Sequence, residues 1–156
     1  MNTATISAAG RNESDTEAFV TFTVAGQLFG VPVIQVQDIL TPDHIAPVPG
    51  GPAQVRGLIN LRGRIVTVID LRTHLSLPKA DSGQTGMCVT VEHRGDAYTL
   101  FVDSVGDVIT LSRSLREGNP ATLDTVWREV ADAVYRTDHG LLVALRIDRL
   151  LAIETT

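Results

Sequence analysis

Hydrophobic and polar residues alternate along much of this chain with a period of two, which is typical of half-buried β-strands. The alternation begins abruptly at Phe19 and returns in short runs that are separated by glycine-containing turns. A short helical turn is expected within 33–40 before a strand, and another at 148–153. The interval 126–136 fits a helix or a strand. The predicted strands cover 19–24, 27–31, the end of 33–40, the two arms of 57–70, 88–92, 97–102, 105–111 and 141–147.

The stretch 57–72 is the most distinctive of these predicted hairpins. Two apolar runs flank the polar break Arg62-Gly63-Arg64, and the glycine suits a tight turn. A turn does not need two guanidinium groups. The arginines therefore either solvate the tip or face an acidic partner.

The chain also resembles itself when it is shifted by 69 residues. Residues 65–70 further resemble 143–148, since both runs end in Ile-Asp. The pattern predicts a duplicated β-unit of about five strands. Two barrels built from such units would bury the Val and Ile surplus together and leave a groove where they meet. The matched positions include Thr21 and Thr90, Gly26 and Gly95, and Val36 and Val105.

Composition narrows the class of protein. The 156 residues are 44% hydrophobic and only 4% aromatic, enough for a core made mainly of Val, Ile and Leu. The net charge of -5 and the lack of a basic run argue against nucleic-acid binding. Residues 1–17 are polar and are expected to form a disordered leader. No apolar run reaches the length of a membrane span, so we expect a soluble, cytoplasmic protein without membrane insertion.

The sequence gives little support for a catalytic function. The four histidines do not have metal-ligand spacing, and the lone Cys88 lies in an apolar run that suggests a buried strand thiol. There is no nucleophile elbow, phosphate-binding loop or dinucleotide motif, so no cofactor is expected. A non-enzymatic binding module is favoured. A small-molecule-binding or catalytic barrel remains the alternative, which a ligand-induced melting shift would support.

One run of residues closely resembles the signature of the CheW family of bacterial chemotaxis coupling proteins. The resemblance extends over roughly residues 18–152. It implies an all-β fold of two intertwined five-stranded SH3-like barrels with a few short helical turns. The implied subdomains cover about 18–78 and 86–148, followed by a C-terminal segment at 149–156. The run reads Val55-x-Gly57-x-x-Asn60-Leu61-Arg62-Gly63-x-Ile65-Val66-x-Val68-Ile69-Asp70-Leu71-Arg72.

The same resemblance implies a role and a set of contact residues. Proteins of this family are adaptors that join the cytoplasmic tips of methyl-accepting chemoreceptors to the regulatory domain of the histidine kinase CheA. They lie in receptor arrays beneath the inner membrane, where CheW–CheW ring contacts also form, and some serve pili or other outputs. Arg64 is not part of the signature and is expected only to solvate the tip. The implied kinase-binding residues are Arg62, Asn60 and Ile39, and the implied receptor-binding residues are Val36, Asp38, Gly57, Val105 and Val108.

Overall fold

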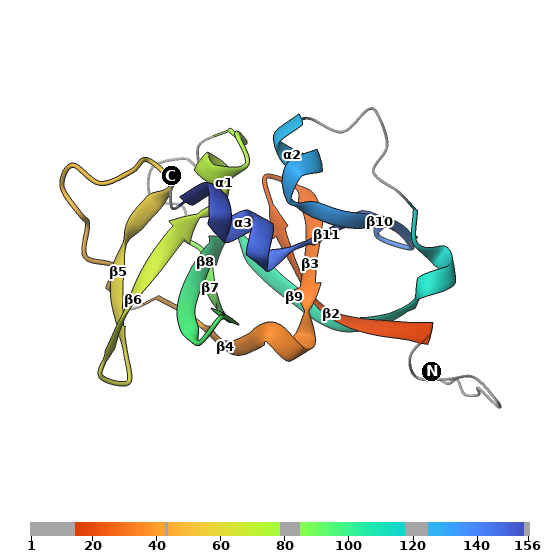
Figure 1. Cartoon of the computed structure of the whole chain (residues 1–156), viewed down its shortest axis with the longest axis horizontal. Helices are drawn as coiled ribbons and strands as arrows, with labels where there is room; N and C mark the ends of the chain where they lie inside the picture. Colours follow the sequence, from red (N-terminus) through yellow and green to blue (C-terminus); the bar gives the residue numbers. More distant parts are fainter. Residues whose placement is uncertain (1–14, 43, 79–84, 118–124, 155–156) are drawn as a thin grey trace.

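A computed structural model describes residues 15–42, 44–78, 85–117 and 125–154 of the chain. Within these ranges the chain is mostly β-strand, and short helices connect the strands (Figure 1). The strands are β2 (Thr16–Val24), β3 (Gln27–Pro32), β4 (Val36–Leu40), β5 (Val55–Leu61), β6 (Arg64–Asp70), β7 (Met87–His93), β8 (Asp96–Val102), β9 (Ser104–Ser112), β10 (Ala131–Thr137) and β11 (Gly140–Leu145). The helices are η2 (Val33–Gln35), α1 (Leu71–His74), η3 (Arg113–Leu115), α2 (Thr125–Val130) and α3 (Ile147–Glu154).

The strands form two five-stranded sheets that lie side by side, with α3 between them (Figure 1). The sheet of the first barrel has the order β10-β11-β3-β2-β9, and that of the second barrel has the order β4-β7-β8-β6-β5. Each sheet contains one parallel pair, β11 with β3 and β6 with β8, and its other pairs are antiparallel. The predicted all-β fold of two intertwined five-stranded units is confirmed.

The predicted repeat is present in this topology. If β2–β6 are matched in order to β7–β11, the strand order of one sheet becomes that of the other. The shift of 69 also preserves register, because Val36 pairs with Val91 while Val105 pairs with Phe22. A bulge interrupts both ladders beside these pairs. The two halves are therefore equivalent in hydrogen bonding as well as in sequence.

Two details of the predicted repeat were wrong. Each barrel takes strands from both halves, so the bounds 18–78 and 86–148 delimit the repeats and not the barrels. The second hairpins are equivalent at a shift of 76, because the Asp70 amide donates to Gln54 and the Arg146 amide donates to Val130. The matching Ile-Asp endings misled the alignment, since one pair ends a strand and the other begins a helix.

Two boundaries also differ from the sequence-based expectation. Strand β2 begins at Thr16, so Thr16 and Glu17 belong to the fold and not to the predicted leader, whose residues 1–14 lie outside the described part. The ambiguous interval 126–136 contains both predicted structures, α2 and then β10. The helical spacing and the alternation were two successive signals in one stretch.

In each sheet, a backbone bridge joins the segment that follows one outer strand to the other outer strand. In the second barrel, Ala46 and Leu58 exchange hydrogen bonds of 2.9 and 2.8 Å, which joins the segment after β4 to β5. In the first barrel, Glu117 and Val134 do the same at 2.9 and 3.1 Å between the segment after β9 and β10. Pairing of this kind satisfies backbone groups that an open sheet edge would leave exposed.

Buried side chains form one core that the two barrels share and one smaller core inside each barrel. The shared core includes Phe22 and Phe29 from the first sheet and Val89 and Leu100 from the second. Neither barrel could leave the other without exposing this apolar surface, so the two are one cooperative unit.

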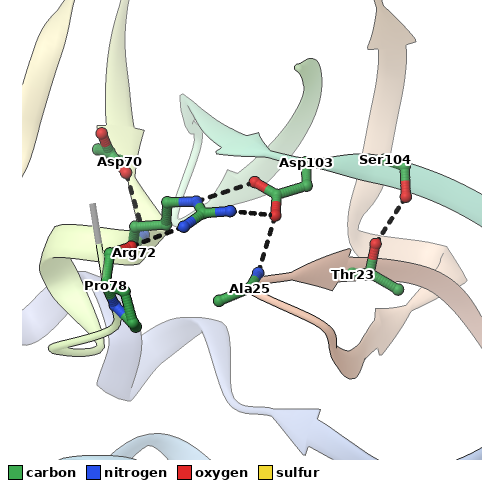
Figure 2. A network of polar contacts seen from close by, with 7 residues as sticks. All are labelled: Thr23, Ala25, Asp70, Arg72, Pro78, Asp103 and Ser104. Carbon is green, nitrogen blue, oxygen red and sulfur yellow. Dashed lines mark hydrogen bonds and ion pairs between the residues drawn. The ribbon is translucent and has the colours of Figure 1, made fainter. Parts of the chain in front are cut away.

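An ion-pair network joins the barrels where β8 leads into β9. The Arg72 guanidinium donates to both carboxylate oxygens of Asp103, at 3.1 and 2.6 Å, and to the carbonyl of Pro78 at 2.6 Å (Figure 2). Asp103 also accepts from the Ala25 amide at 2.8 Å. We call these four residues the crossover clamp. The clamp connects the end of the second barrel's β6 to the β2–β3 turn of the first barrel.

Phe29→Ala tests whether the two barrels fold as one unit. Phe29 is fully buried in the shared core and stacks on Phe22 with ring centroids 6.0 Å apart. We expect a loss of about 3–5 kcal/mol of unfolding free energy, in a single urea transition that both barrels follow. The control Leu115→Ala removes a side chain that is 56% exposed and is expected to cost about 0.5 kcal/mol or less. Two separate transitions would contradict the shared core.

Candidate functional site

The β5–β6 hairpin that carries Arg62 has a two-residue turn. Arg62 and Gly63 both have positive φ values, +55° and +88°, as a type I′ turn requires. Glycine suits this conformation, whereas an arginine adopts it at some cost. The Asn60 side-chain oxygen accepts a hydrogen bond of 2.8 Å from the Gly63 amide. Asn60 thus stabilises the turn that presents Arg62.

Arg62 is held in place by Asp38, a residue on the opposite outer strand of the same sheet. The guanidinium lies 3.0 Å from the Asp38 carboxylate, and the Arg62 side chain is 79% exposed while that of Asp38 is 22% exposed. The second sheet must curl to bring β4 to the β5–β6 tip, because β4 and β5 are its two edges. A predicted kinase contact and a predicted receptor contact are therefore paired with each other.

The equivalent positions in the first barrel have a different charge pattern. A shift of 69 places Asp107 at the position of Asp38, and a shift of 76 places Asp138 at the position of Arg62. Two carboxylates repel and cannot form the same ion pair. Of these two hairpin tips, only the one in the second barrel therefore has an arginine that is held by an aspartate of the opposite outer strand.

The remaining predicted residues of β4 face two directions. Val36 is half-buried and packs against the shared core, whereas Ile39 is 39% exposed. The strand alternates between half-buried and exposed side chains along its length, as expected for an outer strand. Ile39 follows Asp38 in the strand, and its exposed apolar side chain lies on the opposite face of β4 from the Asp38 side chain.

The predicted receptor contacts of the second half lie on β9, in the other barrel. Val105 packs against the shared core from this side, as Val36 does from its own, and Val108 is 56% exposed. Val105 and Val108 are the repeat equivalents of Val36 and Ile39. The predicted receptor set therefore lies mainly on the two equivalent outer strands, one in each barrel.

Gly57 has a structural reason to be glycine. It is buried at a bulge of β5, directly against the segment that bridges to this strand. An added Cβ would clash with the Ala46 carbonyl oxygen and lie 2.7 Å from the Ile45 side chain. Gly57 therefore supports the closure of the second barrel and the position of the hairpin tip.

Several charged residues near the barrel junction had no role in the sequence-based prediction. Arg56 pairs with Asp70 at 3.0 Å and lies over the Phe101 ring, 4.0 Å from its centroid. Asp70 also accepts from the Arg72 amide and so caps α1, and Arg72 belongs to the crossover clamp. Asp70 and Arg72 end the quoted signature, so their positions were visible in the sequence. The partner of the Arg72 side chain was not visible, because Asp103 lies 31 residues away.

An open cavity of about 500 Å³ lies beside Arg56 in the second barrel. Its walls are mainly the proline-containing segment after β4 and the ring of Phe101. Arg56 brings a positive charge, but that charge is already paired with Asp70. The cavity can accept an apolar side chain or a small molecule. It is lined by Thr41, Pro42, His44, Ile45, Pro47, Arg56, Thr85, Gly86 and Phe101.

Two findings bear on metal and thiol chemistry. The described residues hold no group of three His, Cys, Asp or Glu side chains that could bind a metal ion. Cys88 is buried, as predicted, and desolvation raises the pKa of its thiol to about 11 although the nearby Arg56 charge lowers it. The thiol is thus kept protonated at neutral pH.

Comparison with known proteins extends over almost the whole fold. A model of the CheW-like domain matches residues 18–155. The chain belongs to the CheW family. Chemotaxis protein CheW of Bacillus subtilis is 34% identical over 140 residues, which cover 90% of each chain. A probable CheW of Rhizobium etli is 26% identical over 141 residues, with the same coverage.

A solved CheW structure supports the fold. The scaffolding protein TtCheW of Thermoanaerobacter tengcongensis is 28% identical, has a TM-score of 0.75, and aligns over 84% of this chain and 89% of its own. The family match begins at residue 18, where the resemblance was placed, and ends three residues beyond the predicted 152. Among the described residues, no helix is long and apolar enough to cross a membrane.

Gly57→Ala should disturb the closure of the second barrel. Overpacking against the Ala46 backbone is expected to cost about 1–3 kcal/mol of unfolding free energy. Amide exchange at Ala46 and Leu58 should speed up because their bridge is pushed apart. Gly63→Ala is the control, since Gly63 also has a positive φ but has no neighbouring atom within 4 Å of an added Cβ. Unchanged exchange at Leu58 in Gly57→Ala would show that the bridge does not depend on the glycine.

Proposed function

We propose that this protein is a non-catalytic adaptor that couples the cytoplasmic tips of methyl-accepting chemoreceptors to the regulatory domain of the histidine kinase CheA. The observation that carries the proposal is the match to the CheW family over nearly the whole fold. The similar structure is itself described as a scaffolding protein. Such an adaptor would work in the cytoplasm, within receptor arrays at the inner membrane and with ring contacts between copies.

The kinase contact is assigned to the β5–β6 tip. Arg62 is largely exposed, yet its backbone is set by the turn and its guanidinium is oriented by Asp38. Asn60 contributes by stabilising the turn, and Ile39 offers exposed apolar surface on β4, the strand that carries Asp38. A pre-positioned charge of this kind steers association and sets register with an acidic partner.

The receptor contact is assigned to the outer strands β4 and β9. Their exposed apolar side chains suit one face of an amphipathic receptor helix. Val36 and Val105 support these strands from the shared core, and Gly57 leaves room for the Ala46 bridge that closes the second barrel. Because both strands also belong to the barrel edges, a receptor movement can be passed to the kinase-facing tip through one rigid unit.

A non-flagellar chemosensory pathway is the second candidate output. Protein PilI of Pseudomonas aeruginosa is 29% identical over 84 residues, which cover 54% of this chain and 47% of PilI. The same adaptor chemistry would serve either pathway. A deletion strain assayed for swimming and for surface motility would distinguish the two outputs.

Arg62→Glu should weaken kinase binding without unfolding the protein. Exposed ion pairs contribute about 0–1 kcal/mol, so the melting temperature should change little. We expect calorimetry with the CheA regulatory domain to show a loss of affinity on the order of tenfold. Arg64→Glu makes the same charge change two residues away and should bind nearly normally. Equal losses in both variants would reduce the effect to net charge.

Val108→Asp should weaken binding to a receptor-tip fragment. Val108 is 56% exposed on β9, and a carboxylate there would have to be desolvated against an apolar helix face. Leu115→Asp places the same charge on an equally exposed residue that follows β9 and is the matched control. Normal receptor affinity in Val108→Asp, measured by calorimetry, would remove β9 from the receptor surface.

A further inference from the structure

The ion pair of the crossover clamp lies between the strands to which the kinase and receptor contacts are assigned. Arg72 is the second residue after β6, the arm of the hairpin that follows Arg62. Asp103 is the single residue between β8 and β9, and the receptor contact Val105 follows it by two residues. The ion pair therefore joins the end of the kinase-facing hairpin to the start of a receptor-facing strand.

The start of β9 is held from both barrels. The Asp103 amide donates to the Thr23 carbonyl at 3.0 Å, and the hydroxyls of Ser104 and Thr23 are 2.6 Å apart. These contacts fix the crossover to β2 of the first barrel. From the second barrel, the Arg72 guanidinium donates to the two Asp103 carboxylate oxygens (Figure 2). The residue that leads into β9 thus has a defined place relative to both sheets.

The geometry of the Arg72–Asp103 pair is firmly set. Nε and one terminal nitrogen of Arg72 donate to Asp103, and the other terminal nitrogen donates to the Pro78 carbonyl. The two side chains of the pair are 14% and 20% exposed, whereas Arg62 in its own ion pair is 79% exposed. A bidentate contact fixes direction as well as distance, and shielding from water protects it from screening by salt.

The ion pair adds direction at the rim of the shared core. Leu71 and Val102, which directly precede Arg72 and Asp103, are fully buried in that core. Their apolar contacts hold the two barrels together, but such contacts have no preferred direction. The planar guanidinium of Arg72 does have one. It therefore sets where the first residues of β9 lie relative to the end of β6.

The repeat-equivalent crossover shows that this type of connection forms without such a pair. A shift of 69 places Ile34 of the β3–β4 crossover at the position of Asp103. Ile34 is uncharged and 90% exposed, so it cannot take part in an ion pair. Asp148, at the position of Arg72 under the shift of 76, pairs instead with Arg146, two residues away. The clamp at β9 therefore has a purpose other than building the crossover.

We propose that Arg72 and Asp103 are positioning residues that couple the two binding surfaces. By fixing β9 against β6, they pass a receptor-driven movement of β9 to the hairpin that carries Arg62. The inference rests on the proposed function, because it concerns how one adaptor serves two partners. Neither residue has to touch a partner, so loss of the pair lowers the coupling between the two binding events and leaves each single affinity nearly unchanged.

The test measures a coupling factor by calorimetry on the full-length protein. This factor is the ratio of the affinities for the CheA regulatory domain with and without a saturating receptor-tip fragment. We expect about fivefold or more in the unmodified protein. Arg72→Lys keeps the charge but not the planar fork, and Asp103→Asn keeps the shape but not the charge. Each should bring the factor below about two, while each single affinity stays within about threefold.

Arg56→Lys is the matched control. It makes the same change in an ion pair, with Asp70, that lies wholly within the second barrel, so the coupling factor should be kept. The double variant Arg72→Lys/Asp103→Asn should lose no more coupling than either single variant, because the two residues act as one unit. Urea unfolding of every variant checks that it is folded at the temperature of the binding experiment.

Three results would overturn the inference while leaving the adaptor function intact. They are an unchanged factor in a folded Arg72→Lys or Asp103→Asn variant, an equal loss in Arg56→Lys, and a factor near one in the unmodified protein. An unchanged factor would mean that the shared core alone joins the two surfaces. Failure of the unmodified protein to bind either partner would instead overturn the proposed function, and this inference with it.

Discussion

Parallel pairing between strands of opposite halves is the constraint on which this fold depends. The β3 strand of the first half pairs with β11, and the β8 strand of the second half pairs with β6. A parallel pair cannot be made by a tight turn, so each strand must find its partner far along the chain. Each half thereby completes the sheet of the other, and neither sheet can form until both halves are present. The shared core and the crossovers between the barrels follow from this exchange.

Much of the local structure could be predicted because it depends on nearby residues. The alternation from Phe19 onward reports which side chains face the core, and glycines such as Gly63 mark turns that need positive φ. Sheet membership is a different kind of information. Nothing in the pattern of β4 says that it leaves the sheet of β3, because a strand's hydrogen-bonding partner is not encoded in its own alternation. The intertwined topology came instead from the family resemblance, whereas the repeat alone predicted one barrel from each half and placed the second hairpin two residues out of register.

In the candidate site, too, the residues could be identified from the sequence but their long-range partners could not. Arg62 stood out because a turn has no need of it, but its pairing with Asp38 required the sheet to curl and bring its two edges together. Gly57 could be read as a contact residue, whereas the structure gives it a packing role against Ala46. Arg72 could be identified from the sequence as the last residue of the quoted signature. Its role depends on Asp103, which only the crossover between barrels brings near.

The two halves share a backbone, and their differences are concentrated in charge. At the hairpin tips, the Asp38–Arg62 pair corresponds to two carboxylates, Asp107 and Asp138. A repeat with identical surfaces would present every binding site twice and could not separate two partners. Opposite charges at equivalent positions make the same geometry attractive to one partner and repulsive to another, which is how closely related surfaces gain specificity. The backbone symmetry thus supplies two sites of one shape, and a few ionisable side chains make them different.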